Sequence, residues 1–185
     1  MVPVYENYKD YPAPRYARAA IENILAKLPQ QYLSGLRSVV LTNATAVGEG
    51  KTHRIKGKKY LRRECLGYYH PKTTDGQAWI EIVVDNVIAG WPTSGIARVL
   101  WRFPLIRNAR FAQTLCHEVG HHLDHILGAP APSGEAAAEA WKKRLLRLYG
   151  RRQYWYLVPF MRLCAGLLET ILRVAARRRE AARSR

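Results

Sequence analysis

The chain has 185 residues, of which 48% are hydrophobic, and this length and composition predict one globular domain with its own core rather than a disordered chain. Its 30 lysines and arginines outnumber 14 acidic residues, and the resulting net charge of +16 indicates either an anionic partner or an ordinary basic surface. The three cysteines are odd in number and widely spaced, which excludes a disulfide framework and a cysteine-type zinc site.

The first half of the chain predicts one helix and then three strands. Residues 13–28 carry apolar side chains three and four apart and end before a proline, as an amphipathic helix does. Residues 36–44 predict the first strand. A second strand is expected from the basic stretch 51–63 through Tyr69, and a third over 78–87.

The second half predicts three helices. Residues 107–127 give the strongest helical pattern, with six apolar side chains on one face. After a loop rich in glycine and proline, Ser133 can cap a helix that runs to about Tyr149. The stretch 154–176 has a broad apolar face and one narrow charged stripe, which predicts an amphipathic helix packed on the domain rather than one that crosses a membrane. The order of the elements is typical of an α+β fold.

This pattern predicts a domain over residues 1–150, followed by an appended amphipathic helix and basic tail over 151–185. The chain does not begin with a basic segment followed by an apolar one, so we expect no secretory signal and a cytoplasmic location. Peripheral contact with a membrane surface is the alternative that the apolar and basic C-terminal stretch leaves open.

The helix over 107–127 contains the most informative motif, His117-Glu118-Val119-Gly120-His121. Because His117 and His121 are four residues apart, they stack on one helical face, where two imidazoles can hold one zinc ion at about 2.0–2.1 Å. Glu118 would flank the metal, take a proton from a water bound there and pass it to a leaving amine. The alternative interpretation is a polar helix face that carries surface histidines.

A third ligand is expected from the next helix. The position six residues after His121 is Leu127, which excludes a three-histidine motif, and His125 lies about 12 Å along the axis from the first histidine. Glu135 and Glu139 are four residues apart on the following helix, so one can bind zinc while the other orients a ligand histidine. A strictly antiparallel helical hairpin favours Glu139.

The segment from about 111 to 146 resembles the zinc-binding helices of gluzincin metallopeptidases, including the thermolysin-like enzymes and the anthrax lethal factor catalytic domain. In thermolysin-like enzymes the zinc-binding glutamate is followed by alanine and, four residues on, by a carboxylate, as Glu135 is followed by Ala136 and Glu139. Asp124, three residues after His121, is similar to the lethal factor motif. The resemblance implies Glu135 as the third ligand, zinc as the cofactor and peptide hydrolysis with Glu118 as general base.

The preceding helix and strands resemble a minigluzincin, the smallest zincin-like fold. There the last strand before the active-site helix is an edge that pairs with the substrate backbone, which implies 78–87 as the substrate-binding strand. The resemblance matches no residue that stabilises the transition state. Tyr149, Tyr154 and Tyr156 are candidates because a phenol can support a developing oxyanion, and packing is their alternative role.

A rival function is a basic module that binds nucleic acid or a membrane surface and has a structural or vestigial zinc site. Its basis is the basic stretch 51–63 and the tail after Arg177, although 51–63 lacks the interleaved aromatic residues of a single-strand-binding surface. The sequence offers only three good zinc ligands, which favours a catalytic metal with an open position. We therefore expect a peptide or protein substrate, with weak, salt-sensitive polyanion or membrane contact. We interpret His122 and His125 as solvent-exposed histidines beside the site, and a second metal is the alternative.

Overall fold

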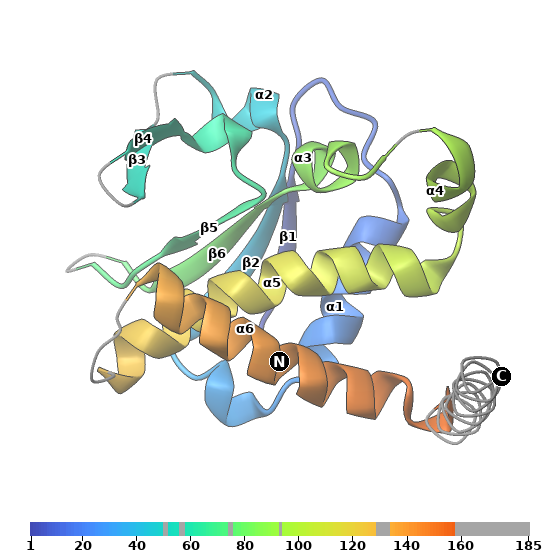
Figure 1. The fold of residues 1–185 in the computed structure, drawn as a ribbon. Helices are drawn as coiled ribbons and strands as arrows, with labels where there is room; N and C mark the ends of the chain where they lie inside the picture. Colours follow the sequence, from blue (N-terminus) through green and yellow to red (C-terminus); the bar gives the residue numbers. More distant parts are fainter. Residues whose placement is uncertain (50–51, 56–57, 74–75, 93, 129–133, 158–185) are drawn as a thin grey trace, which may run out of the picture. The chain divides into compact units, whose positions relative to one another are not determined.

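A computed structural model of the chain describes residues 1–49, 52–55, 58–73, 76–92, 94–128 and 134–157 (Figure 1). The chain divides into two compact units, Met1–Tyr149 and Gly150–Arg185. The predicted cap Ser133, and the predicted C-terminal helix from residue 158 on, lie outside the described residues. No helix in the described ranges is long and apolar enough to cross a membrane.

The first unit contains a mixed four-stranded sheet in the order β1-β2-β6-β5, rather than the predicted three-stranded sheet. Strands β1 and β6 run parallel to β2, and β5 runs antiparallel to β6. The strands are β1 (Val4–Asn7), β2 (Leu36–Thr42), β5 (Gly67–His70) and β6 (Ala78–Val83). Sequence patterns missed β1 because it has four residues, of which only the first is buried.

The basic stretch 51–63 was predicted to form part of a strand of this sheet, but it does not. It contains a separate antiparallel hairpin of β3 (Thr52–Ile55) and β4 (Lys58–Leu61), followed by the 3-10 turn η2 (Arg62–Glu64). Seven basic residues leave this stretch little apolar surface to bury in a core, which accounts for its separation from the main sheet.

The strand predicted over 78–87 ends at Val83, where the chain turns into helix α3 (Val84–Ala89). The Asp85 carboxylate accepts a hydrogen bond from the backbone N–H of Asn86, and its two oxygens lie 3.1 Å from the N–H of Ala44, the first residue of α2 (Ala44–Val47). A further short helix, α4 (Gly95–Leu100), was not predicted.

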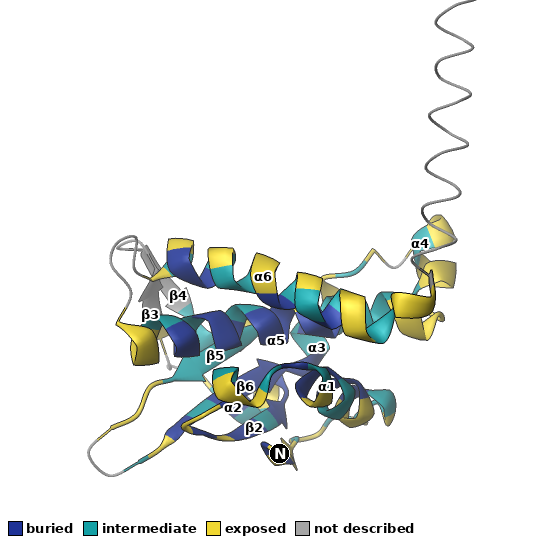
Figure 2. Cartoon of the chain, turned by 90° about the horizontal axis from the view of Figure 1, so that it is seen from below, coloured by how far each residue is buried: buried dark blue, intermediate teal, exposed yellow. Residues whose placement is uncertain are grey.

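Helices α1 (Tyr16–Lys27) and α5 (Pro104–Leu127) pack together on one face of the sheet (Figure 1). Pro104 suits the first turn of α5, and Gly128, with φ 56°, adopts the left-handed conformation that ends it. Helix α6 (Glu135–Gln153) runs beside α5, and the 3-10 turns η1 (Gln30–Tyr32) and η3 (Trp155–Leu157) complete the described elements. Figure 2 shows that α5 is buried along much of its length, because neighbours cover it on several sides.

Candidate metal centre

Helices α5 and α6 bring three potential metal ligands together. His117 and His121 lie one turn apart on α5, and both direct Nε2 toward the carboxylate of Glu135, the first residue of α6. The Nε2 atom of His117 is 3.4 Å from Glu135 Oε2, and that of His121 is 3.6 Å from Oε1. Within the described ranges, no other group of histidine, cysteine and acidic side chains is arranged to hold a metal ion.

These three side chains could hold a metal ion. One ligand atom from each lies within 4.8 Å of the other two, and two imidazoles with one carboxylate are a ligand set that zinc accepts. Burial lowers the pKa of His117, although the charge of Glu135 opposes this, and a neutral imidazole is the form that binds metal. The side chains of His117, His121 and Glu135 are between 22% and 34% exposed, so the cluster is open to a small ligand.

Glu118 lies beside this cluster and is only 6% exposed. Burial, and after it the charge of Glu135, raise the pKa of its carboxyl group to about 8, although a hydrogen bond to the backbone of Tyr69 opposes the shift. A cation at the neighbouring ligands would also oppose it. Glu118 therefore binds a proton more strongly than an ordinary glutamate.

Two glycines allow the close approaches that build the site. A Cβ atom on Gly67 of β5 would lie 2.9 Å from Glu118 Cγ and 3.1 Å from Thr114 Cγ2. A Cβ atom on Gly120 of α5 would lie 2.6 Å from the backbone oxygen of Ala138 on α6. Gly67 thus lets β5 pass directly against Glu118, and Gly120 lets α6 come near enough to α5 for its first residue to reach the histidines. A glycine inside a helical motif was the sequence signal for the second contact.

Two further carboxylates lie near the cluster, one at the start of α6 and one beside His117. Asp124 Oδ2 accepts a hydrogen bond of 2.7 Å from the backbone N–H of Gly134, one residue before the ligand glutamate, and so ties the start of α6 to α5. Glu139 Oε2 lies 3.8 Å from His117 Nδ1, a buried nitrogen that lacks a hydrogen-bond partner. A metal-bound histidine commonly donates its other ring N–H to a carboxylate, and Glu139 is positioned near that nitrogen.

His122 is completely buried, so the prediction that it is exposed was wrong, whereas His125 is exposed as expected. The Nε2–H of His122 donates to the carbonyl of Ser34 at 2.8 Å, which leaves Nδ1 to accept from the hydroxyl of Tyr69 at 3.2 Å. Tyr69 is also the residue whose backbone holds Glu118. His122 thus supports β5 where this strand meets the candidate base, and its spacing of three residues from the buried Val119 was the signal.

Other predicted residues are not brought to the site. The 78–87 strand is not an edge, because β6 lies between β2 and β5. Tyr149 is buried 14 residues along α6 from Glu135, roughly 21 Å, so the structure does not support it as an oxyanion stabiliser. Tyr154 and Tyr156 belong to the second unit and receive no role. Cys116 is a buried thiol whose pKa burial raises to about 12, as expected for a packing residue.

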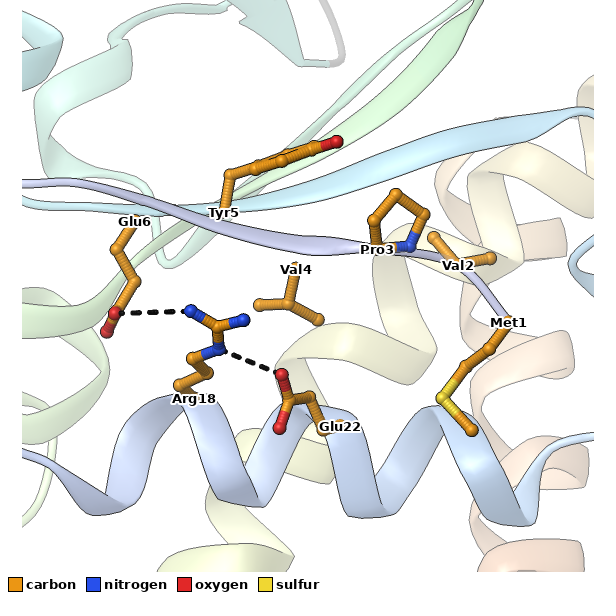
Figure 3. A pocket seen from close by; sticks show the side chains of 8 residues that line it. All are labelled: Met1, Val2, Pro3, Val4, Tyr5, Glu6, Arg18 and Glu22. Carbon is orange, nitrogen blue, oxygen red and sulfur yellow. Dashed lines mark hydrogen bonds and ion pairs between the residues drawn. The ribbon is translucent and has the colours of Figure 1, made fainter.

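A separate hollow of about 770 Å³ lies between β1 and α1 (Figure 3). Figure 3 shows Arg18 between Glu6 and Glu22, and the ion pairs measure 3.8 Å and 2.8 Å. None of the metal-ligand candidates lines this hollow. Its charged groups are already paired with each other, so it does not add to the candidate site.

Comparisons of this chain with known protein families, curated proteins and solved structures find no match. The geometry of the site therefore carries the functional argument.

Proposed function

We propose that the chain is a zinc-dependent peptidase in which His117, His121 and Glu135 hold the metal and Glu118 is the general base. The observation that carries this proposal is the convergence of three ligand atoms beside a buried carboxyl group. A zinc ion bound there would supply Lewis acidity, which polarises a carbonyl group and lowers the pKa of a water molecule. A structural zinc normally has four protein ligands, and the described cluster offers three, which supports catalysis over a structural site.

The protein side chains would transfer the proton and hold the catalytic groups in their orientation. Glu118 accepts a proton as water attacks the peptide carbonyl and then delivers it to the amine that leaves when the C–N bond breaks. The bond to the Tyr69 backbone restricts the Glu118 carboxyl to one orientation. Glu139 would orient His117 by accepting from its Nδ1–H once the ring is held in place.

The edge strand β5, rather than the predicted strand 78–87, is where we propose that a peptide substrate pairs. Its position supports a peptide as the substrate class. The carbonyl of Leu66 accepts from Val83 on β6, so in an antiparallel pair the alternate residues Gly67 and Tyr69 direct backbone groups away from β6. The N–H of Tyr69 donates to Glu118, and the backbone groups of Gly67 and the carbonyl of Tyr69 are those offered to a peptide. An extended peptide added there as another strand would pass next to Glu118.

Replacement of the general base tests the proposal. Zinc-loaded full-length protein should cleave members of a mixed peptide library, and Glu118→Gln should keep its zinc and its fold but lose at least about a hundredfold in rate. Cleavage products are followed by mass spectrometry. Glu22→Gln is the control, because it makes the same substitution on α1, outside the candidate site, and it should leave the rate unchanged. Equal rates for Glu118→Gln and the unaltered protein, or no cleavage by the zinc-loaded unaltered protein, would contradict the proposal.

A further inference from the structure

An exposed apolar surface lies at the opposite end of α5 from the metal centre. It is formed by residues 94–105, which we call the α4 lobe, and Figure 1 places it where α4 leads into α5. Figure 2 shows α4 as mostly exposed, in contrast to the buried length of α5. Five large apolar side chains of the lobe are between 36% and 77% exposed: Ile96, Val99, Leu100, Phe103 and Leu105. Side chains of this kind at such density mark an interaction surface.

The lobe has a defined internal structure. The indole Nε1–H of Trp91 donates to the carbonyl of Ala97 at 2.7 Å, and the rings of Trp91 and Trp101 lie 5.6 Å apart. These two half-buried tryptophans therefore hold the short helix α4 in place. Tryptophan is also the side chain that is enriched where apolar and aqueous phases meet.

The segment of chain that contains the lobe carries charge of one sign. Residues 87–117 contain four arginines and no aspartate or glutamate, within a chain whose net charge is +16. Arg98 and Arg102 are exposed on the lobe itself, among its apolar side chains. The partner must therefore accept apolar insertion and supply negative charge at the same surface.

We propose that the α4 lobe docks on the surface of an anionic lipid membrane, with Ile96, Val99 and Phe103 inserted and Arg98 and Arg102 at the headgroups. A lipid surface satisfies both features, since the acyl boundary buries the apolar side chains and the phosphates pair with the arginines. A second copy of the chain would oppose arginine to arginine, because the lobe carries no acidic residue. Nucleic acid would pair with the arginines but leave the exposed aliphatic side chains in water.

Flotation of the full-length chain with vesicles tests the proposal, which does not depend on peptidase activity. The chain should float with phosphatidylcholine vesicles that contain phosphatidylglycerol and bind pure phosphatidylcholine much more weakly. Ile96→Ser with Phe103→Ser should lower the partition coefficient at least about tenfold. Arg98→Gln with Arg102→Gln should lower it about 25-fold, roughly fivefold for each charge near the surface.

Matched variants distinguish the effect of the lobe on vesicle binding from the effect of the overall charge and apolar content of the chain. Arg37→Gln with Lys72→Gln removes the same charge from two exposed positions at the end of the sheet away from α3, and Ile126→Ser with Leu127→Ser removes exposed apolar residues at the other end of α5. Both should change partition less than about twofold, because neither pair lies on the α4 lobe and charges beyond the Debye length are screened. Flotation that both lobe variants leave unchanged would overturn the proposal. The proposal would also be overturned if the unaltered chain did not float and the lobe variants instead dissociated a dimer or released a duplex oligonucleotide.

Discussion

Glu135 and Glu139 lie one turn apart on α6 but touch different partners. The Glu135 carboxylate faces the Nε2 atoms of both histidines, whereas Glu139 lies 2.5 Å from Lys142 Nζ and reaches only the Nδ1 side of His117. The hydrogen bond from Lys142 also holds the pKa of Glu139 below its usual range. Glu135 thus lies where it could share a metal ion with the two histidines, whereas Glu139 lies beside the other ring nitrogen of His117.

This difference predicts the order of two affinity losses. Glu135→Ala removes a ligand and should weaken zinc binding far more than Glu139→Ala, for which a loss of about 10–100-fold is expected. Competition titration with a chromophoric zinc chelator measures both constants. A greater loss in Glu139→Ala would transfer the ligand role to that residue.

At this scale, local spacing predicted only part of the site. Two histidines four residues apart must share a helical face, so His117 and His121 followed from the sequence, and the resemblance to gluzincins indicated Glu135. The burial of Glu118 was not predicted from this spacing, and His122 was wrongly expected to be exposed. Their burial depends on β5, which lies some fifty residues earlier in the chain and covers both side chains.

Among the elements, the contact of α5 with α6 depends on Gly120. Gly120→Ala should lower the free energy of unfolding by about 1–3 kcal/mol, because a methyl group would meet the Ala138 backbone. It should also weaken zinc binding, since α6 carries Glu135. Gly150→Ala has nothing within 4 Å of the added atom and should be neutral or stabilising by up to about 1 kcal/mol. Urea unfolding and zinc titration of the two variants check this, and equal behaviour would contradict it.

A polar cluster joins η2 to strands β5 and β6. Arg62 of η2 donates to the carboxylate of Glu81, and His70 Nε2 lies 2.9 Å from Arg62 and 3.3 Å from Glu81. The His70 ring also stacks on Trp79, with ring centroids 3.6 Å apart. Burial alone would raise the pKa of Glu81, but the hydrogen bonds and charges of His70 and Arg62 outweigh it and lower the pKa.

The cluster predicts a pH-dependent contribution to stability. A carboxyl group whose pKa is lower in the folded state stabilises the fold above its ordinary pKa, here 4.5, and loses that effect as the pH falls through the folded value. Glu81→Gln should therefore cost about 1–3 kcal/mol at pH 7 and less below about pH 4.5. Urea unfolding of chelator-treated protein at both pH values measures the difference, with the exposed Glu64→Gln as control. An equal cost at both pH values would contradict this prediction.

The elements that could be predicted are those whose pattern matches a single environment. Helices α1 and α5 and strand β2 bury a regular set of side chains, and their predicted ranges nearly match the observed ones. The apolar run after Ala78 suited either a strand or a helix, so the change to α3 was missed. Helix α4 buries no residue against the rest of the unit and left no helical periodicity to detect.

In the molecule as a whole, helix α5 connects the proposed metal centre with the proposed membrane-docking lobe. Its first two residues belong to the α4 lobe, and His117 follows 13 residues after Pro104, about 20 Å along the axis. In a chain docked through the lobe, His117 would lie at most about 20 Å further from the lipid surface than the start of α5 does. The α+β architecture was predicted correctly, but its four-stranded sheet and separate hairpin depend on strand pairing that local sequence does not specify.

The metal content of the purified full-length chain, prepared without chelators, tests the central claim most directly. Elemental mass spectrometry should find about one zinc per chain, and His121→Ala should remove it because two ligands bind zinc weakly. His125→Ala, an exposed histidine one turn further along the same helix, should retain the zinc. A full-length chain that carries no divalent metal, or a His121→Ala variant that keeps its zinc, would contradict the account.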